Sequence, residues 1–579
     1  MNVSATELLR IGDDDPFSRA TLPRDDVFRR ASVATRTPKP ALRAIEPLLS
    51  PPETCLHNEP GRPLRFAVMT EPWWKSSVVY QIYPRSFADS NGDGVGDLQG
   101  IRGRLDHLAW LGVDAIWLSP FYRSPMADFG YDVSDYCDVD PLFGTLADFD
   151  ELVADAHALG IRVIVDWVPN HTSDQHPWFV DAQSSRTAEH RDWYVWRDQT
   201  ADGAPPNNWV QTWTEDQPTW TVSPTTDQWY LHLFLPQQPD LNWRNPAVVA
   251  AMHDVLRFWM DRGVDGFRMD VLHALGKDSD LIDDPPELLP IPHSALNHHD
   301  STYEIVQGLR SVLDEYDGDR MMVGEIFLLD TAMVASYYDG GQGVHLAFNF
   351  PPLYTPWDAG LWRYRVEEVV REIDPQGWPS WVLSNHDQPR HRTRYGTEAR
   401  ARAAAVLLLG LRGTAFLYAG EEFGLEDGVI PTDRVVDPGG RDGCRAPIPW
   451  TSAIDHGWGT DDPWLPWPPN PVDRNAEAVR ADETSILHLY RRLLAERRAS
   501  TALHVGSQEL LGAPAGVLAW DRTDGSDRRR LAVNFTSEPV SLGSLATGWL
   551  LAVSTDGLGE GSPFSGELGP DQAVVLRPA

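Results

Sequence analysis

The stretch that decides the fold is Gly263-Val264-Asp265-Gly266-Phe267-Arg268-Met269-Asp270-Val271-Leu272-His273, a short apolar run that ends in charged groups. A parallel strand covered on both faces should be almost entirely apolar, so charges at its carboxyl end need partners or a function. Residues 321–327 and 381–387 repeat this pattern, and each contains a carboxylate. We therefore expect three carboxylates to meet in one pocket: Asp270, Glu325 and Asp387.

Around this stretch, apolar strands alternate with amphipathic helices. The predicted strands span residues 78–83, 113–118, 161–167, 264–269, 321–325, 345–349, 380–384 and 414–418. The predicted helices span residues 98–111, 149–159, 247–262 and 484–498. This alternation implies parallel pairing through right-handed crossovers. Eight such strands predict an α/β fold of the (β/α)8 TIM-barrel type, in which catalytic groups lie at the carboxyl ends of the strands.

Composition divides the chain into further parts. Residues 1–70 are rich in Pro and charge, and we expect a disordered or loosely docked extension. The barrel should comprise residues 71–170 and 243–500. Between its two parts, residues 171–242 are too long for an ordinary βα loop and predict an inserted subdomain. Residues 501–579 should form a C-terminal antiparallel β-domain. Its expected strands are residues 509–511, 516–520, 531–534, 549–553 and 573–576.

The overall charge restricts the partners. A net charge of −35 and a pI near 4.8 argue against nucleic acid and anionic membranes, which require a basic face. A small neutral or cationic substrate is favoured instead. The three cysteines are too few for a disulfide framework. Neither a signal peptide nor a bilayer-spanning apolar run is visible, so we expect a cytoplasmic protein.

Four predicted strand ends carry polar groups suited to catalysis. They are 166–171, 268–270, Glu325 and 385–387. Carboxylates that cannot all be comfortably ionised together are what acid–base and nucleophilic chemistry needs. Any one of them alone could instead cap a loop amide, but four strand ends together favour a shared site.

These motifs resemble those of the α-amylase family, glycoside hydrolase family 13. Residues 166–171, 266–273, 324–325 and 385–387 look like its four signatures. Residues 238–242, Gln-Pro-Asp-Leu-Asn, resemble a further signature of its α-glucosidase and oligo-1,6-glucosidase branch. The resemblance runs from about residue 73 to the C-terminus.

The resemblance implies that Asp270 is the nucleophile and Glu325 the general acid/base. Arg268 would keep Asp270 ionised, since it lies two residues earlier on the same strand face and can lower the pKa of Asp270. The apolar neighbours of Glu325 would favour its neutral form. Net retention, also implied by the family, requires the two carboxyls to lie about 5–5.5 Å apart.

The same resemblance assigns the sugar contacts. Asp387 would bind sugar hydroxyls and help to distort the ring, while His171 and His386 would donate hydrogen bonds to the same sugar. Tyr131 would stack on this sugar, and Asp128 would bind the hydroxyls of a terminal glucose. In this branch an Arg after the eighth strand pairs with that Asp and closes the pocket beyond one sugar. Arg445 is our candidate for it, with Arg441 as the second choice.

A tight loop after the first strand suggests a metal site. Residues 89–97, Asp-Ser-Asn-Gly-Asp-Gly-Val-Gly-Asp, place oxygen ligands at alternate positions, which suits Ca²⁺, with Mg²⁺ as the alternative. An Asx-rich turn without metal is the competing interpretation. The branch resemblance supports a structural site formed by Asp89, Asn91, Asp93, the carbonyl of Val95, and Asp97.

The function expected from these features is that of a retaining, exo-acting α-glucosidase that releases glucose from short α-glucosides. Val271 follows the nucleophile, and in this branch Val at that position tends to accompany α-1,6 activity. An oligo-1,6-glucosidase or a transglucosylating enzyme is therefore the alternative. A remote alternative is a sugar-binding or scaffold homologue without turnover, which would be expected to lack one of the three carboxylates.

Overall fold

The computed structural model describes residues 71–212, 217–285 and 299–579. Residues 72–579 form one compact unit. The expectation for residues 1–70 lies outside the described residues.

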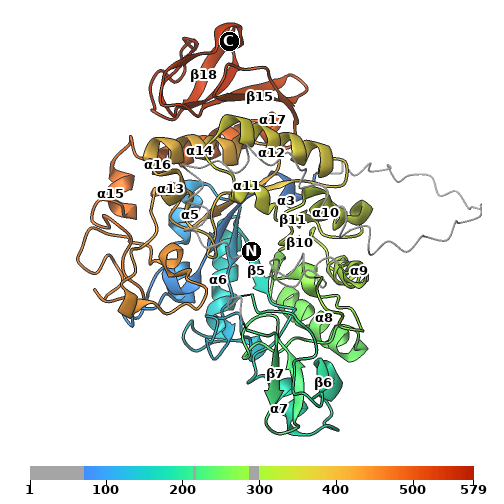
Figure 1. Ribbon diagram of the computed structural model, residues 1–579. Helices are drawn as coiled ribbons and strands as arrows, with labels where there is room; N and C mark the ends of the chain where they lie inside the picture. The colour runs from blue at the N-terminus through green and yellow to red at the C-terminus, as the bar shows by residue number, and fades with distance from the viewer. Residues whose placement is uncertain (1–70, 213–216, 286–298) are drawn as a thin grey trace, which may run out of the picture. The chain divides into compact units, whose positions relative to one another are not determined.

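Eight parallel strands form a nearly closed barrel, as predicted (Figure 1). They are β1 (Val78–Ile82), β2 (Ala115–Leu118), β5 (Arg162–Trp167), β9 (Gly266–Met269), β10 (Met321–Gly324), β11 (Leu346–Ala347), β12 (Ser380–Val382) and β13 (Thr414–Tyr418). Hydrogen-bonded neighbours run in the order β11-β10-β9-β5-β2-β1-β13-β12. Ser380 Oγ on β12 donates to the Ala347 carbonyl on β11 at 2.7 Å, which links the two end strands. The carboxyl ends of all eight strands therefore share one face.

Helices cover the outside of this barrel. They include α3 (Trp73–Ser76), α6 (Leu146–Ala158), α8 (Pro246–Asp261), α9 (Ser301–Leu313), α10 (Thr331–Ser336), α12 (Ala359–Glu372), α13 (His391–Tyr395), α14 (Glu398–Gly410), α15 (Ala476–Ala481) and α16 (Ile486–Ala499). Helix α6 begins with a capping box in which Thr145 and Asp148 bond each other's backbone amides. This cap explains why the helix begins three residues before the predicted start.

The helix predicted over residues 98–111 is wrong in one respect, because it is two helices. Helix α4 (Leu98–Arg102) ends at Gly103, and α5 (Leu105–Leu111) begins after Arg104. Glycine has low helix propensity, and the Arg104 guanidinium stacks on Trp450 at 4.4 Å. The apolar spacing continues across the break, so it could not reveal the interruption.

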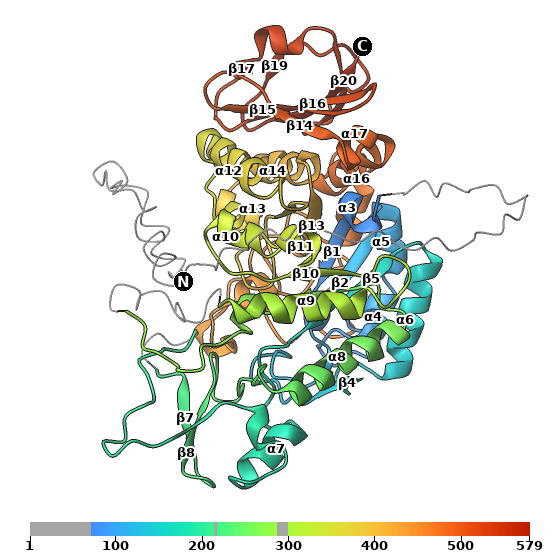
Figure 2. The ribbon, with the colours of Figure 1, turned by 90° about the vertical axis from the view of Figure 1, so that its right-hand side faces the viewer.

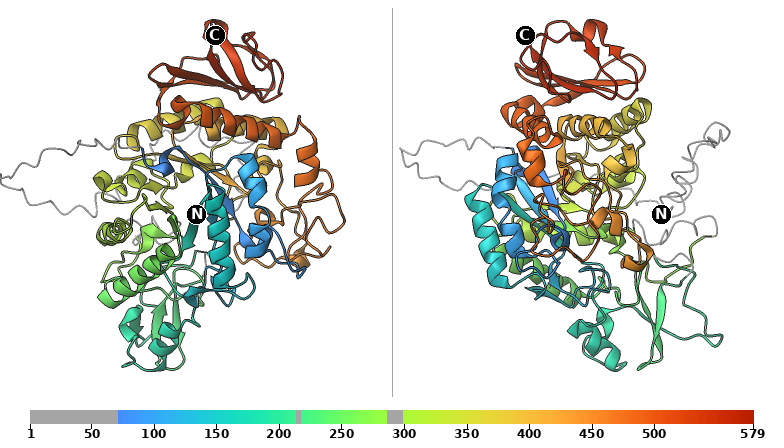
Figure 3. Two further views of the ribbon diagram at one scale, coloured as in Figure 1. Left: turned by 180° about the vertical axis from the view of Figure 1, so that it is seen from behind. Right: turned by 90° about the vertical axis from the view of Figure 1, so that its left-hand side faces the viewer.

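The predicted inserted segment folds as a small layer of its own. It contains α7 (Pro177–Ser184) and an antiparallel sheet of order β6-β8-β7, formed by β6 (Trp196–Asp198), β7 (Trp220–Ser223) and β8 (Gln228–Leu231). Trp209 and Trp220 are buried in its apolar core. Together with α7, this sheet lies at the opposite side of the described unit from the C-terminal sheet (Figure 3).

The C-terminal strands form an antiparallel sheet, as predicted. Its order is β14-β15-β16-β20-β18, from β14 (Ser507–Leu510), β15 (Val517–Asp524), β16 (Asp527–Asn534), β18 (Trp549–Ser554) and β20 (Ala573–Pro578). Strands β15 and β16 are longer than expected, because Arg530 pairs across the hairpin with Asp521 at 2.7 Å. This half of the hairpin is charged, so an apolar sequence pattern could not predict it as strand.

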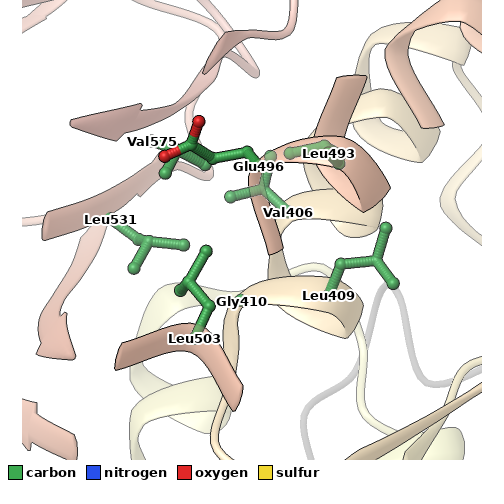
Figure 4. A pocket seen from close by; sticks show the side chains of 8 residues that line it. All are labelled: Val406, Leu409, Gly410, Leu493, Glu496, Leu503, Leu531 and Val575. Atoms are coloured by element: carbon green, nitrogen blue, oxygen red, sulfur yellow. The ribbon is translucent and has the colours of Figure 1, made fainter. Parts of the chain in front are cut away.

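The sheet packs onto barrel helices α14, α16 and α17 (Thr501–His504) (Figure 2). Between them lies a small, largely apolar pocket, which we call the C-terminal seam (Figure 4). It is lined by Val406, Leu409, Gly410, Leu493, Glu496, Leu503, Leu531 and Val575. A Cβ on Gly410 would lie 2.2 Å from Leu531 Cδ2, so glycine permits this close approach.

Across the three described ranges, every helix is too short or too polar to cross a membrane.

Candidate active site

One buried guanidinium organises the carboxyl ends of three neighbouring strands. Arg268 on β9 lies 2.9 Å from Asp166 on β5, 2.5 Å from Asp270, and 2.9 Å from Glu325 after β10. Its side chain is 2% exposed. Strand pairing in register, Asp166 beside Arg268, produces the first of these contacts. The expected meeting of Asp270 with Glu325 is thus observed, with Asp166 as an additional member.

The protonation of Asp270 differs from expectation. Burial raises the pKa of Asp270, Arg268 acts to lower it, and the neighbouring Glu325 and Asp166 raise it further. Arg268 thus acts in the expected direction, and burial together with the two nearby carboxylates opposes it. Burial likewise raises the pKa of Asp166 to about 6. A hydrogen bond joins Asp270 and Glu325, so this pair can hold one proton between them.

Glu325 is held by a strained backbone. Its Oε2 accepts a hydrogen bond from the Val271 amide at 2.9 Å. Val271 has φ +47° and ψ +36°, a left-handed conformation that a β-branched residue rarely adopts. Such strain costs about 1–3 kcal/mol and persists where the surroundings require it. In this conformation the backbone amide of Val271 points at the Glu325 carboxylate.

The apolar flanks of Glu325 do not surround its carboxylate in the expected way. Val323 and Ile326 are buried in apolar cores, and the Phe327 ring packs edge-on against Phe350 at 5.1 Å. The carboxylate contacts the Arg268 guanidinium and the Val271 amide instead.

A second cation closes the other side of the pocket. Arg441 Nη2 lies 2.6 Å from Asp128 Oδ1, and Arg441 Nη1 lies 3.1 Å from Asp387 Oδ1. Arg445 also contacts Asp387 at 3.1 Å, but its Nε donates to the His386 carbonyl at 2.8 Å. The prediction that Arg445 pairs with Asp128 is therefore wrong. The hydrogen bond to the His386 carbonyl holds Arg445 next to Asp387. The residue that contacts Asp128 is Arg441, the second choice.

The charge of Asp387 is stabilised by its neighbours. Burial alone would raise the pKa of Asp387, but His386, Arg441 and Arg445 together lower it. Asp387 is thus ionised at neutral pH and able to accept hydrogen bonds from sugar hydroxyls.

Two buried, neutral histidines support the pocket. Burial lowers the pKa of His171 to about 4 and that of His386 to about 3. Gln81 Nε2 lies 2.7 Å from His386 Nδ1, which leaves the proton on Nε2, beside the Tyr131 hydroxyl at 2.5 Å and Asp387 at 3.3 Å. His171 Nε2 lies 3.0 Å from the Tyr131 carbonyl. The Nε2 proton of His386 is therefore directed at Tyr131, whereas Nε2 of His171 lies between the Tyr131 carbonyl and the Gln238 amide nitrogen, 3.0 Å from each.

Tyr131 is buried beside the Arg268 cluster, and its stacking on a sugar stays a prediction. Its ring is parallel to the His386 ring, with 5.4 Å between centroids, and its hydroxyl donates to Asp166 at 3.0 Å. The Arg268 guanidinium also lies over the Tyr131 ring, 5.9 Å from its centroid.

The predicted metal loop folds as a series of Asx turns. Asp89 accepts from the amides of residues 91, 92 and 94, Asn91 from residue 93, and Asp93 from residue 95. Asp97 caps α4 by accepting from Gly100 at 2.6 Å. Gly94 has φ +88°, as such a turn requires. Nowhere in residues 71–212, 217–285 and 299–579 do three or more His, Cys, Asp or Glu side chains converge as a metal site.

Comparison with known proteins identifies the family. The family model for the α-amylase catalytic domain matches residues 81–506. The chain belongs to the α-amylase family of glycoside hydrolases. It is 43% identical over 508 residues to a probable alpha-glucosidase of Rhizobium meliloti (strain 1021), covering 81% of this chain and 90% of that protein. An oligo-1,6-glucosidase of Parageobacillus thermoglucosidasius is 35% identical over 519 residues, covering 81% and 92%.

A solved α-amylase-family structure has the same fold. The crystal structure of the alpha-glucosyl transfer enzyme XgtA matches with a TM-score of 0.82 and 40% identity, covering 88% of this chain and all of that chain.

Three residues of this α-amylase-family site were given no individual role from the sequence. Asp166 bonds Arg268, Gln238 Nε2 donates to Asp128 at 3.2 Å, and Asp437 contacts Arg441 at 2.6 Å. Asp166 and Gln238 lie inside motifs that resemble those of the family, so their positions in these motifs could have identified them as site residues. Asp437 precedes Arg441 by four residues on a segment without a motif.

Proposed function

We propose that this protein is a retaining, exo-acting α-glucosidase that releases glucose from the non-reducing end of short α-glucosides. The observation that carries the proposal is the buried contact of Arg441 with both Asp128 and Asp387. A terminal glucose has hydroxyls for these carboxylates, whereas a longer chain would have to displace the guanidinium. The enzyme names borne by the relatives support the same activity.

The chemistry follows from the Arg268 cluster. Asp270 attacks the anomeric carbon while Glu325 gives its proton to the departing glycosidic oxygen, and a covalent glycosyl-enzyme forms. Glu325 then takes a proton from the water that attacks this intermediate, which regenerates Asp270 and retains the anomeric configuration. The retaining mechanism is supported by the contact of both carboxylates with one guanidinium, which lies 2.5 Å from Asp270 and 2.9 Å from Glu325.

Arg268 assists both steps. The negative charge leaves Asp270 when the glycosyl-enzyme forms and appears on Glu325 after proton transfer. Since the guanidinium contacts both carboxylates, it can stabilise the charge in either location without moving.

Glucose release from a substrate panel tests this proposal. The panel contains maltose, isomaltose, sucrose, trehalose and maltotetraose, with soluble starch as the polymer. We expect glucose with retained anomeric configuration from the short substrates, measured by NMR at early times. Rapid internal cleavage of starch without glucose release would overturn the exo assignment.

Linkage and transfer define a second candidate function. The oligo-1,6-glucosidase and the alpha-glucosyl transfer enzyme among the relatives support α-1,6 cleavage and glucosyl transfer, respectively. Val271, next to the nucleophile, agrees with α-1,6 preference. The isomaltose-to-maltose rate ratio and the yield of transfer products at high sugar concentration separate these activities from maltose hydrolysis.

We also propose that the loop 89–97 binds Ca²⁺ as a structural ion, with Mg²⁺ as the alternative. Support comes from its oxygen donors at positions 1, 3, 5, 7 and 9 with Gly at position 6, a spacing that suits Ca²⁺. These donors fit the ion chemically, although their oxygens also accept backbone amides. Melting temperatures measured after chelation and after adding back each ion test it. An unchanged melting temperature in all conditions would contradict a structural ion.

We place the protein in the cytoplasm. Support comes from Cys137 and Cys444, both free thiols, in a chain poor in cysteine. Activity measured in separated cell fractions tests this placement.

A further inference from the structure

The segment after β11 contributes no motif, yet it carries polar groups without partners. Asn349 and Tyr354 flank the short helix α11 (Phe350–Leu353). Within the described part of the chain, the Asn349 amide atoms and the Tyr354 hydroxyl are buried and form no hydrogen bond. An unsatisfied buried polar group costs about 1–3 kcal/mol, so its presence calls for a ligand or another compensating role.

Tyr354 follows α11 and β11, and β11 lies between the strands that lead to two carboxylates. Strand β11 pairs with β10, which leads to Glu325, and β11 is linked through Ser380 to β12, which leads to Asp387. The Tyr354 ring lies 6.4 Å from the ring of Phe327, two residues beyond Glu325. Burial, with added effects of Asp387 and Glu325, raises the pKa of Tyr354. Its hydroxyl is therefore protonated and available as a donor.

The glucose side of the pocket is already occupied by a connected set of polar contacts. Asp128, Gln238, Arg441 and Asp387 bond one another, and Tyr354 takes no part in these bonds. Tyr354 instead contacts the segment that follows Glu325, the residue that protonates the departing oxygen. The leaving group of a substrate is attached to that oxygen, so we expect it on the Glu325 side of the site.

We propose that Tyr354 binds the leaving group, by donating a hydrogen bond to a hydroxyl of the sugar or alcohol beyond the scissile bond. This inference rests on the proposed function, and it specifies which residue binds the part of the substrate that leaves. The class favoured is a hydroxylated leaving group, such as the second glucose of a disaccharide. In glucosyl transfer the same contact would hold the acceptor.

The variant Tyr354→Phe tests this role because it removes only the hydroxyl. We expect kcat/KM for isomaltose or maltose to fall about 3- to 10-fold, the effect of one neutral hydrogen bond. Hydrolysis of p-nitrophenyl α-glucoside should change less than about twofold, since its leaving group has no sugar hydroxyl to bind. The fraction of product formed by transfer to added glucose should also fall. The pH profile should keep its shape, which a role in tuning Glu325 would alter.

The matched control is Tyr364→Phe, the same chemical change on a side chain that is 50% exposed on α12. It should behave as the wild type with both substrates. Equal losses of kcat/KM with the disaccharide and the aryl glucoside would overturn the proposal. They would mean that Tyr354 contacts the glucose or the attacking water. No loss with either would also overturn it. If the wild type releases glucose from neither substrate, the proposed function itself fails.

Discussion

The catalytic pocket and the C-terminal seam are built in opposite ways. In the pocket, Arg268, Arg441 and Arg445 hold buried carboxylates at hydrogen-bonding distance. In the seam, apolar side chains such as Leu531 fill the space between helix and sheet, and the one charged lining residue, Glu496, pairs with Arg529. Buried ion pairs recover their desolvation cost only in good geometry, whereas apolar burial stabilises the fold directly. Changes in the pocket should therefore affect catalysis most, and changes in the seam should affect stability.

The largest expected effect is that of Asp270→Asn. The amide cannot form the glycosyl-enzyme, so kcat should fall by at least about 10⁴-fold. The melting temperature should stay the same or rise, because a crowded carboxylate is removed while Arg268 keeps Asp166 and Glu325. Asp314→Asn, an exposed aspartate paired with Arg310 on α9, is the control. Turnover by Asp270→Asn at the wild-type rate would mean that another residue is the nucleophile.

The second prediction separates the two arginines after β13. A lysine at position 441 cannot contact Asp128 and Asp387 together, so Arg441→Lys should lower kcat/KM for disaccharides about 100-fold, mainly through KM. It should also improve the relative rate on maltotetraose, because the closed end of the pocket is loosened. Steady-state kinetics on both substrates measure this.

Arg445→Lys should leave the relative rate on maltotetraose unchanged, since Arg445 does not contact Asp128. Arg434→Lys, with its side chain 38% exposed, is the control and should not differ from wild type. A chain-length change in Arg445→Lys but not in Arg441→Lys would reverse our assignment.

The third prediction concerns the seam. Leu531 is fully buried, so Leu531→Ala should lower the free energy of unfolding by about 2–5 kcal/mol, from lost burial and the cavity that remains. Urea denaturation followed by tryptophan fluorescence measures the loss, with Leu558→Ala, 71% exposed, as the control. At temperatures where the variant is folded, kcat should equal that of the wild type. A selective loss of kcat in the folded variant would show that the seam and the pocket are coupled.

The smallest expected effect is that of pH on stability. Burial lowers the pKa of several histidines to about 3 or 4: His171, His176, His232, His345 and His386. The unfolded chain binds protons at these sites near pH 6.5, so stability should fall as the pH drops from about 6.5 toward 4. Three buried carboxyls partly offset this fall, because the folded chain protonates them first: Asp132 and Asp166, with pKa values raised to about 6 by burial, and Asp270, whose pKa burial also raises.

Urea denaturation at pH 7.5 and 5.5 measures this balance. We expect a loss on the order of 1–3 kcal/mol at the lower pH. Greater stability at pH 5.5 would mean that the buried carboxyls outweigh the histidines.

The barrel could be predicted because its strands are apolar runs at regular intervals, and their ends carry motifs. The same reasoning failed where tertiary contacts decided the outcome. The stacking of Arg104 on Trp450 accompanies a helix break that the apolar spacing conceals, and the pair formed by Arg530 and Asp521 extends a hairpin through polar sequence.

The site shows the same division. The sequence indicated Asp270, Glu325 and Asp387 through their positions at strand ends. It favoured Arg445 over Arg441 wrongly, because two arginines four residues apart on one short segment differ only in the residues that they contact in the folded chain. Tyr354 gave no signal at all, since an unpartnered hydroxyl is recognisable only when its surroundings are known.

The closed end of the pocket has a consequence for how such enzymes diverge. Asp437, Arg441 and Arg445 all belong to the segment after β13, and its neighbouring side chains Val435 and Val436 are exposed. None of the strands that carry Asp270, Glu325 or Asp387 has to change for this segment to be exchanged. An exchange of this segment between relatives would therefore alter the length of sugar that is admitted, and it would also reach catalysis through Asp387, which both arginines contact.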